Sequence, residues 1–153
     1  MPRIDLAALP EITGTGYPQR LAQAVAGRSR KALGDAAGLT QFGVNLVTLA
    51  AGAASSLRHW HENEDEFLWM LEGEAVLVED GGETVLRAGD AAGWKAGVAN
   101  GHQLVNRSAA PARFLVVGTR AARETCRYAD VDLLYRRDGE AERFTRRDGS
   151  PPD

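Results

Sequence analysis

The sequence has a single cysteine, Cys126, among its 153 residues. No disulfide can therefore form within the chain, as is typical of proteins from a reducing compartment. Cys126 could serve as a catalytic thiol, but a buried and unreactive side chain is the commoner role of a lone cysteine.

Long apolar runs are also missing. No run approaches the roughly 18 residues that a membrane-spanning helix needs. The first residues, MPRIDLAALPEITG, lack the apolar segment of a secretory signal. We therefore expect a cytoplasmic protein with no membrane partner.

The chain has no excess of positive charge. Its 18 Lys and Arg residues are outnumbered by 21 Asp and Glu residues, which gives a net charge of -3. Proteins that bind nucleic acid normally carry a basic patch. The two Arg-rich stretches, residues 28–31 and 136–147, are interleaved with acids or glycines, and we interpret them as solvated surface. Nucleic acid is not an expected partner.

What the sequence does contain is a succession of short apolar stretches separated by turn residues. A chain of this length fits one compact domain. Closely spaced short strands favour a sandwich or barrel over alternating strands and helices. The strands are expected at residues 40–50, 66–71, 74–79, 83–87, 102–106 and 112–119. The sequence therefore predicts an all-β fold.

The two ends of the chain have a different texture. Residues 1–38 are predicted to form an irregular arm with a short helix over Gln19–Ala26. Residues 39–135 are predicted to form the barrel. Residues 136–153 are charged and end in Pro-Pro-Asp, so we expect a frayed or lightly docked tail. All three parts are expected to belong to one domain.

The predicted strand EFLWML, residues 66–71, is apolar on both faces. An antiparallel strand usually exposes one face to water. Its outer face is therefore expected to be covered, either by the N-terminal segment or by a second copy of the chain. The second alternative predicts a homodimer.

Only three histidines occur, and two of them form the pair His59-Trp60-His61. Residues two apart on an extended strand point to the same face, so both imidazoles can approach one ion. Glu66 and His102 supply further ligand atoms of the kinds that divalent transition metals accept. Surface histidines are common, however, and the spacing alone leaves a metal site and a solvated pair equally open.

The stretch from residue 52 to residue 73, GAASSLRHWHENEDEFLWMLEG, resembles the first of the two motifs of the cupin superfamily. That motif combines a glycine, H-x-H, a glutamate and a closing glycine. The spacer after the first glycine is one residue longer here than usual. The positions that match are Gly52, His59, His61, Glu66 and Gly73.

The stretch from residue 89 to residue 106, GDAAGWKAGVANGHQLVN, resembles the second motif. Lys95 stands where a proline is usual, and Asn100 stands at the expected histidine position. Because asparagine is a poor ligand and His102 keeps its spacing to Asn106, we assign the ligand role to His102. The positions that match are Gly89, Gly97, His102 and Asn106.

The resemblance implies a cupin jelly-roll barrel that holds one divalent ion of zinc, iron, nickel or manganese. Its implied ligands are His59, His61, Glu66 and His102. It also implies a metal-dependent enzyme acting on a small oxygenated metabolite, with isomerase, lyase or dioxygenase chemistry. Some similar bacterial cupins carry a sugar-phosphate isomerase label. A non-catalytic module that binds a metal or small ligand is the alternative.

Residues beside the motifs have open roles. Lys95 could bind an anion or act in catalysis at the barrel mouth, although a surface lysine at a turn is the simpler interpretation. Trp94 could line the pocket entrance or pack in the core. Trp60 is expected to point away from its two flanking histidines.

Overall fold

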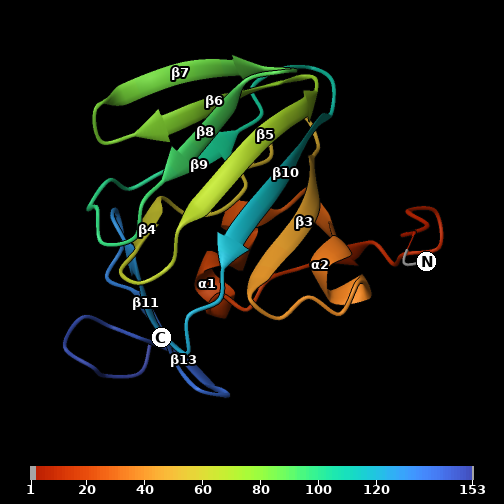
Figure 1. Ribbon diagram of the computed structural model, residues 1–153. Coiled ribbons are helices and arrows are strands. Elements are labelled where there is room, and N and C mark those ends of the chain that lie inside the picture. The colour runs from red at the N-terminus through yellow and green to blue at the C-terminus, as the bar shows by residue number, and fades with distance from the viewer. Residues whose placement is uncertain (1–2, 153) are drawn as a thin grey trace.

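The computed structural model describes residues 3–152, which form antiparallel sheets folded into a flattened barrel (Figure 1). One layer is a six-stranded sheet in the order β1-β2-β3-β10-β5-β8, with a four-stranded sheet (β13-β12-β11-β4) and a three-stranded sheet (β7-β6-β9) opposite. The strands are β1 (Ile12–Thr13), β2 (Arg28–Ala32), β3 (Phe42–Leu49), β4 (His59–His61), β5 (Glu66–Glu72), β6 (Glu74–Glu79), β7 (Gly82–Arg87), β8 (Ala91–Trp94), β9 (Gln103–Val105), β10 (Ala112–Thr119), β11 (Arg123–Tyr128), β12 (Leu134–Asp138) and β13 (Ala141–Thr145).

The helical segments are short. They are α1 (Gln19–Ala22), the 3₁₀ turn η1 (Gln23–Val25) and α2 (Leu33–Ala36). Within residues 3–152, none of the helices has the length and apolar character that crossing a membrane would require. The predicted all-β fold with a short N-terminal helix is confirmed, and the expected strands agree with the observed ones to within a few residues at each end.

The core fills the space between the two layers. Alternation along β5 turns Leu68 and Met70 inward, where they are 2% and 0% exposed. Phe114 on β10 lies beside them and is 1% exposed. Together with Leu49, Leu77 and Leu104 these side chains form one contiguous apolar cluster. This cluster fixes the position of β5, at whose start Glu66 lies, whereas β4 is held by its pairing with β11.

The N-terminal segment contains strands where the sequence predicts an irregular arm. β2 pairs with β3 over Arg28–Ala32, and β1 pairs with β2, so the segment extends the large sheet. The prediction missed β2 because its sequence, RSRKA, is charged and has no apolar alternation. Backbone pairing with the edge of β3 forms this strand, with no need for an apolar side.

The C-terminal segment is likewise ordered, which corrects the expectation of a frayed tail. β12 and β13 form a hairpin that pairs with β11. Phe144 packs edge-on against Tyr17, with ring centroids 5.8 Å apart, and Thr145 is buried. The segment is rich in arginine, so its composition predicted a solvated tail, although a few residues such as Phe144 and Thr145 anchor it to the rest of the domain.

The outer face of β5 is not covered by the part of the chain that the structure describes, residues 3–152. Phe67, Trp69 and Leu71 are 47%, 47% and 40% exposed. Within residues 3–152 the N-terminal segment therefore does not shield them, and that alternative is wrong. A second copy of the chain stays a prediction.

Candidate metal centre

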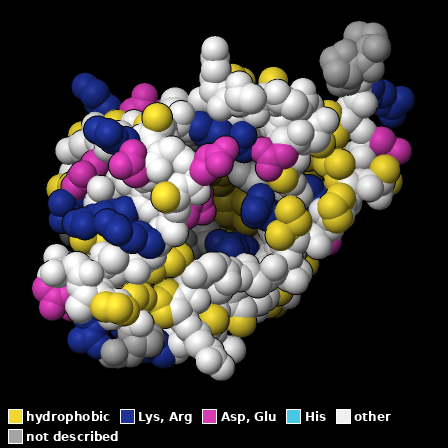
Figure 2. All heavy atoms as spheres, turned by 90° about the horizontal axis from the view of Figure 1, so that it is seen from below, with side chains coloured by type: hydrophobic (Ala, Val, Ile, Leu, Met, Phe, Trp, Pro, Cys, Tyr) yellow, Lys and Arg dark blue, Asp and Glu magenta, His cyan; other side chains and the backbone are white. Residues whose placement is uncertain are grey.

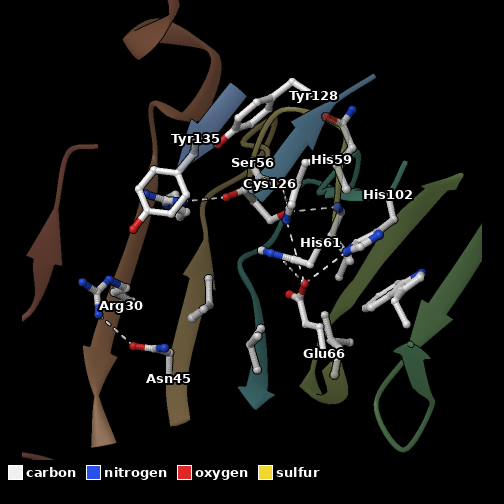
Figure 3. A pocket seen from close by; sticks show the side chains of 18 of the residues that line it. Arg30, Asn45, Ser56, His59, His61, Glu66, His102, Cys126, Tyr128 and Tyr135 are labelled. Carbon is white, nitrogen blue, oxygen red and sulfur yellow. Dashed lines mark hydrogen bonds and ion pairs between the residues drawn. The ribbon is translucent and has the colours of Figure 1, made fainter. Parts of the chain in front are cut away.

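Four side chains from three parts of the sequence meet inside the barrel. β4 carries His59 and His61 on one face, and Glu66 begins β5. His102 lies opposite His59 because the two residues exchange backbone hydrogen bonds of 3.1 and 2.9 Å. The Glu66 Oε2 atom lies 3.1 Å from the Nε2 atom of His102, 3.5 Å from that of His61 and 3.8 Å from that of His59. Figure 3 shows the three imidazoles gathered around this carboxylate.

The backbone orients two of these imidazoles. His59 Nδ1 lies 2.9 Å from the carbonyl oxygen of Leu57, and His102 Nδ1 lies 3.1 Å from that of Asn100. A ring that donates its Nδ1–H to a carbonyl presents Nε2 as a lone-pair donor. Both Nε2 atoms are therefore available to a metal ion.

The third imidazole faces a buried carboxylate. His61 Nδ1 lies 3.4 Å from Glu124 Oε1, without a well-aligned hydrogen bond. Glu124 is 3% exposed and accepts the backbone N–H groups of Glu62 and Asn63 at 3.0 and 2.9 Å. A carboxylate behind a histidine raises the basicity of that ligand and sets its orientation. No motif in the sequence indicates Glu124, because it lies on β11, 58 residues from Glu66 in the chain.

The charges of the cluster are strongly coupled. Burial lowers the pKa of His59 to about 4, so this imidazole is neutral near pH 7. Burial also lowers the pKa of His61, but the carboxylates of Glu124 and Glu66 outweigh it and raise that pKa to about 9. Burial raises the pKa of Glu66, but its histidine neighbours dominate and hold it well below its usual range. Glu66 is therefore an anion surrounded by nitrogen donors.

These residues fit a divalent transition metal. His59, Glu66 and His102 each offer a ligand atom within 4.8 Å of the others. Three imidazoles and one carboxylate suit zinc, iron, nickel and manganese alike. The buried and poorly paired Nδ1 of His61 adds to the fit, because metal binding at Nε2 would fix that ring with its N–H toward Glu124.

The cluster opens into a cavity of about 350 Å³. Figure 2, which views the molecule from below, shows a hollow with a hydrophobic floor and both Lys or Arg and Asp or Glu side chains around it. The polar side chains that line the cavity include Arg28, Arg30, Asn45, Ser55, Ser56 and Gln103, and its aromatic side chains include Tyr17, Trp94, Phe114, Tyr128, Tyr135 and Phe144. The volume and the mixture of apolar walls with few polar groups are typical of small-molecule sites.

Residues of the second motif support the cluster. Trp94 stacks on His102, with ring centroids 3.9 Å apart and planes 6° apart. Glu79 accepts the Trp94 Nε1–H and an Asn100 Nδ2–H, both at 2.8 Å. The Asn100 side chain is thus used in the wall of the site, while its backbone carbonyl orients His102. The structure brings His102, and not the Asn100 side chain, to the carboxylate of Glu66.

Other predicted residues lie elsewhere or take a different role. Lys95 is exposed and is not among the side chains that line the cavity, so its place is that of a surface lysine. Trp60 points away from the histidines and lies under Arg127, with the guanidinium carbon 5.8 Å from the ring centroid. Cys126 is buried, and its Sγ lies within 4.8 Å of ligand atoms of His59 and His61. Burial raises the pKa of this thiol, which keeps it protonated.

Comparisons with known proteins agree with this geometry. The family model described as a cupin domain matches residues 45–118. A crystal structure of a sugar phosphate isomerase of the cupin superfamily from Silicibacter pomeroyi is 53% identical in sequence. The alignment covers 99% of this chain and 97% of that one, with a TM-score of 0.96. This chain belongs to the cupin superfamily.

More distant solved structures share the fold. A protein from Acidithiobacillus ferrooxidans, also given a sugar phosphate isomerase name, is 24% identical over 88% of this chain and 85% of its own, with a TM-score of 0.77. The polyketide cyclase RemF from Streptomyces resistomycificus is 20% identical over 78% and 79% of the two chains, with a TM-score of 0.65. No curated protein sequence matched this cupin. Proteins with such different names on one fold leave the reaction to be argued from the site.

Proposed function

We propose that this cupin is a metal-dependent enzyme that acts on a small oxygenated metabolite, with isomerisation of a sugar phosphate as the first reaction to test. The observation that carries the proposal is the convergence of three Nε2 atoms on Glu66 Oε2 at 3.1 to 3.8 Å. His59, His61, Glu66 and His102 would hold the ion. A bound divalent ion would polarise a carbonyl or hydroxyl oxygen of the substrate. The similar protein from Silicibacter pomeroyi supplies the choice of reaction.

The chain's own residues provide binding and shielding. Leu68, Phe114 and Val116 line the cavity and exclude water from one wall. Stacking by Trp94 restricts rotation of the His102 ring. Both effects keep the polar groups of the site in fixed positions, which is the main contribution of a preorganised active site.

A specific observation also favours the non-catalytic alternative, a module that binds a metal or small ligand. Among the described side chains that line the cavity, no carboxylate, lysine or histidine lies outside the four proposed ligands. An isomerase that works by proton transfer needs a group that moves the proton, and such a group normally titrates near neutral pH. The module would bind the same ligands without turning them over.

Measuring turnover before and after metal removal distinguishes the enzyme from the non-catalytic module. We expect the purified protein to isomerise at least one member of a panel of phosphorylated aldoses and ketoses. Treatment with a chelator should abolish that activity, and reloading one divalent metal should restore it. Binding of a panel member without turnover, under every metal tested, would contradict the enzyme and support the module.

Metal binding is expected to release a proton near pH 7. A histidine must be neutral to bind a metal. The pKa of His61 is raised to about 9, so this residue is protonated below that pH when no metal is bound. Affinity should therefore increase about tenfold per pH unit up to about pH 9 and then level off. Calorimetry in two buffers of different ionisation enthalpy measures the released proton, and a value near zero would contradict the assignment of His61.

A further inference from the structure

Strand β2 carries basic side chains on both faces, but only the outer one, Lys31, forms an ion pair with an acid. Ser29 Oγ donates to Glu11 Oε1 at 2.7 Å. Lys31 Nζ lies 3.7 Å from Glu11 Oε2. The outer lysine is therefore compensated by a carboxylate.

The inner side chains of the same strand are Arg28 and Arg30. Their partners in the sheet are Leu49 and Val47, which are 0% and 7% exposed, so this face looks into the barrel. Both arginines line the cavity that contains the candidate metal centre. The expectation that residues 28–31 are solvated surface is wrong for these two side chains.

The partners of both guanidinium groups are neutral. Arg28 donates to the carbonyl oxygens of Ser55 and Gly14 at 2.7 and 3.1 Å. Arg30 donates to Asn45 Oδ1 at 2.8 Å. Within residues 3–152, neither arginine forms an ion pair with a carboxylate. A guanidinium has five N–H donors, so each group keeps donors for another acceptor.

Two half-buried positive charges on one wall are unfavourable without a negative partner. Burial lowers the pKa of Arg28, and the charge of Arg30 acts in the same direction. An anion in the cavity would relieve both effects. Arginine suits this purpose because its planar fork binds phosphate and carboxylate through two parallel hydrogen bonds.

The cationic wall lies across the cavity from the candidate metal centre. In Figure 3, Arg30 and Asn45 lie on one side and Glu66 with the three histidines on the other. Val47, Val116 and Phe114 line the cavity as well and are apolar. Because the two polar walls are joined by apolar ones, a ligand that fills this space would need one polar end at the arginines and another at the metal centre.

We propose that Arg28 and Arg30 form an oxyanion subsite that binds the phosphate or carboxylate group of a small metabolite whose opposite, oxygenated end reaches the metal centre. The placement of that opposite end rests on the proposed function, whereas the binding of the anion does not. Phosphate and carboxylate share the required chemistry, and the experiment distinguishes them.

The test titrates inorganic phosphate, and separately acetate, into wild-type protein and the variants Arg30→Gln and Lys31→Gln. Each protein is measured by calorimetry both as purified and after metal removal by a chelator. Arg30→Gln is the main variant, because Arg30 bonds a side chain and not the backbone. Lys31→Gln removes the same charge from the outer face of the same strand and is the matched control.

We expect wild type and Lys31→Gln to bind at least one anion equally well, before and after metal removal. Arg30→Gln should bind it about 10- to 100-fold more weakly, the loss expected for one charge-assisted contact. Its thermal midpoint should not fall, because an uncompensated charge has been removed. Tighter binding of phosphate than of acetate indicates a phosphate monoester as the ligand, and the reverse indicates a carboxylate.

Equal affinities of wild type and Arg30→Gln for both anions, including no binding by either protein, would overturn the subsite. An equal loss in Lys31→Gln would also overturn it, because the effect would then be one of net charge. If the wild type takes up no metal, but Arg30→Gln still binds the anion more weakly than the wild type does, the proposed function fails and the subsite stands.

Discussion

Replacing His59 and His61 together by alanine is expected to abolish metal binding. The wild type should hold about one equivalent of a divalent transition metal, and the double variant none, because two of the four proposed ligands are lost and the remaining pair, Glu66 and His102, is a weak site. Elemental analysis of untagged protein measures both values. The metal found would also direct the assay, since iron favours oxygen chemistry and zinc or manganese favours isomerase chemistry.

The fold of the double variant should survive. Its main apolar cluster includes Leu68, Met70 and Phe114 but neither histidine. Far-ultraviolet circular dichroism should therefore resemble that of the wild type. Unchanged metal content in a folded variant would contradict the ligand assignment. A wild type that holds no metal and cannot be loaded would instead favour the ligand-binding module.

Asn100→Ala is the control for the second motif. Its side chain bonds Glu79 and the backbone N–H of Asp80, whereas its backbone carbonyl bonds His102 Nδ1. Alanine retains that carbonyl, so metal content should stay at the wild-type level. Loss of the metal would mean that the wrong residue of this motif has been assigned as ligand.

Glu124→Gln is expected to weaken metal binding by about 10- to 100-fold, the effect usual for a carboxylate that supports a histidine ligand. The substitution keeps the shape of the side chain but removes the negative charge 3.4 Å from His61 Nδ1. Less negative charge makes the imidazole a weaker donor. Competition with a chromogenic chelator measures the dissociation constant.

A matched control separates this effect from the mere loss of one negative charge. Glu72→Gln removes the same charge from an exposed residue of β5 that pairs with Arg113 at 3.0 Å. It should leave metal affinity unchanged. Glu124→Gln should also unfold more readily. The carboxylate accepts hydrogen bonds from two backbone N–H groups, whereas the amide can accept only through its oxygen, and its NH2 group would face the second N–H donor. Wild-type affinity in a folded Glu124→Gln protein would show that Glu124 does not act through His61.

The sequence predicted the parts of the site that depend on local spacing. Residues two apart on a strand share a face, so the spacing predicted that His59 and His61 point the same way, and the resemblance to the cupin motif then implied their role as ligands. Gly73 has φ of +73°, and a Cβ there would lie 2.6 Å from the oxygen of Pro111. Only glycine fits at this position, and a fixed glycine at a fixed spacing from the histidines helps to identify the motif in a sequence.

The choice of His102 over Asn100 came from the resemblance and from ligand chemistry. The structure supplies its geometric basis, a backbone bridge between His59 and His102 that aligns the two imidazoles. The two-residue shift in the motif is accommodated because Asn100 takes a place in the wall of the site.

By itself the sequence determined the all-β fold and six of the strands, and through its resemblance to the cupin motifs it implied the candidate metal ligands, because alternation and motif spacing are local properties of the chain. Only the tertiary structure decided which distant side chains share the cavity. Glu124 supports His61, Cys126 lies beside the histidines, and Arg28 and Arg30 turn inward from a strand that resembles solvated surface in the sequence. Each of these positions follows from strand pairing between distant segments, and the pairing register sets which face a charged residue occupies.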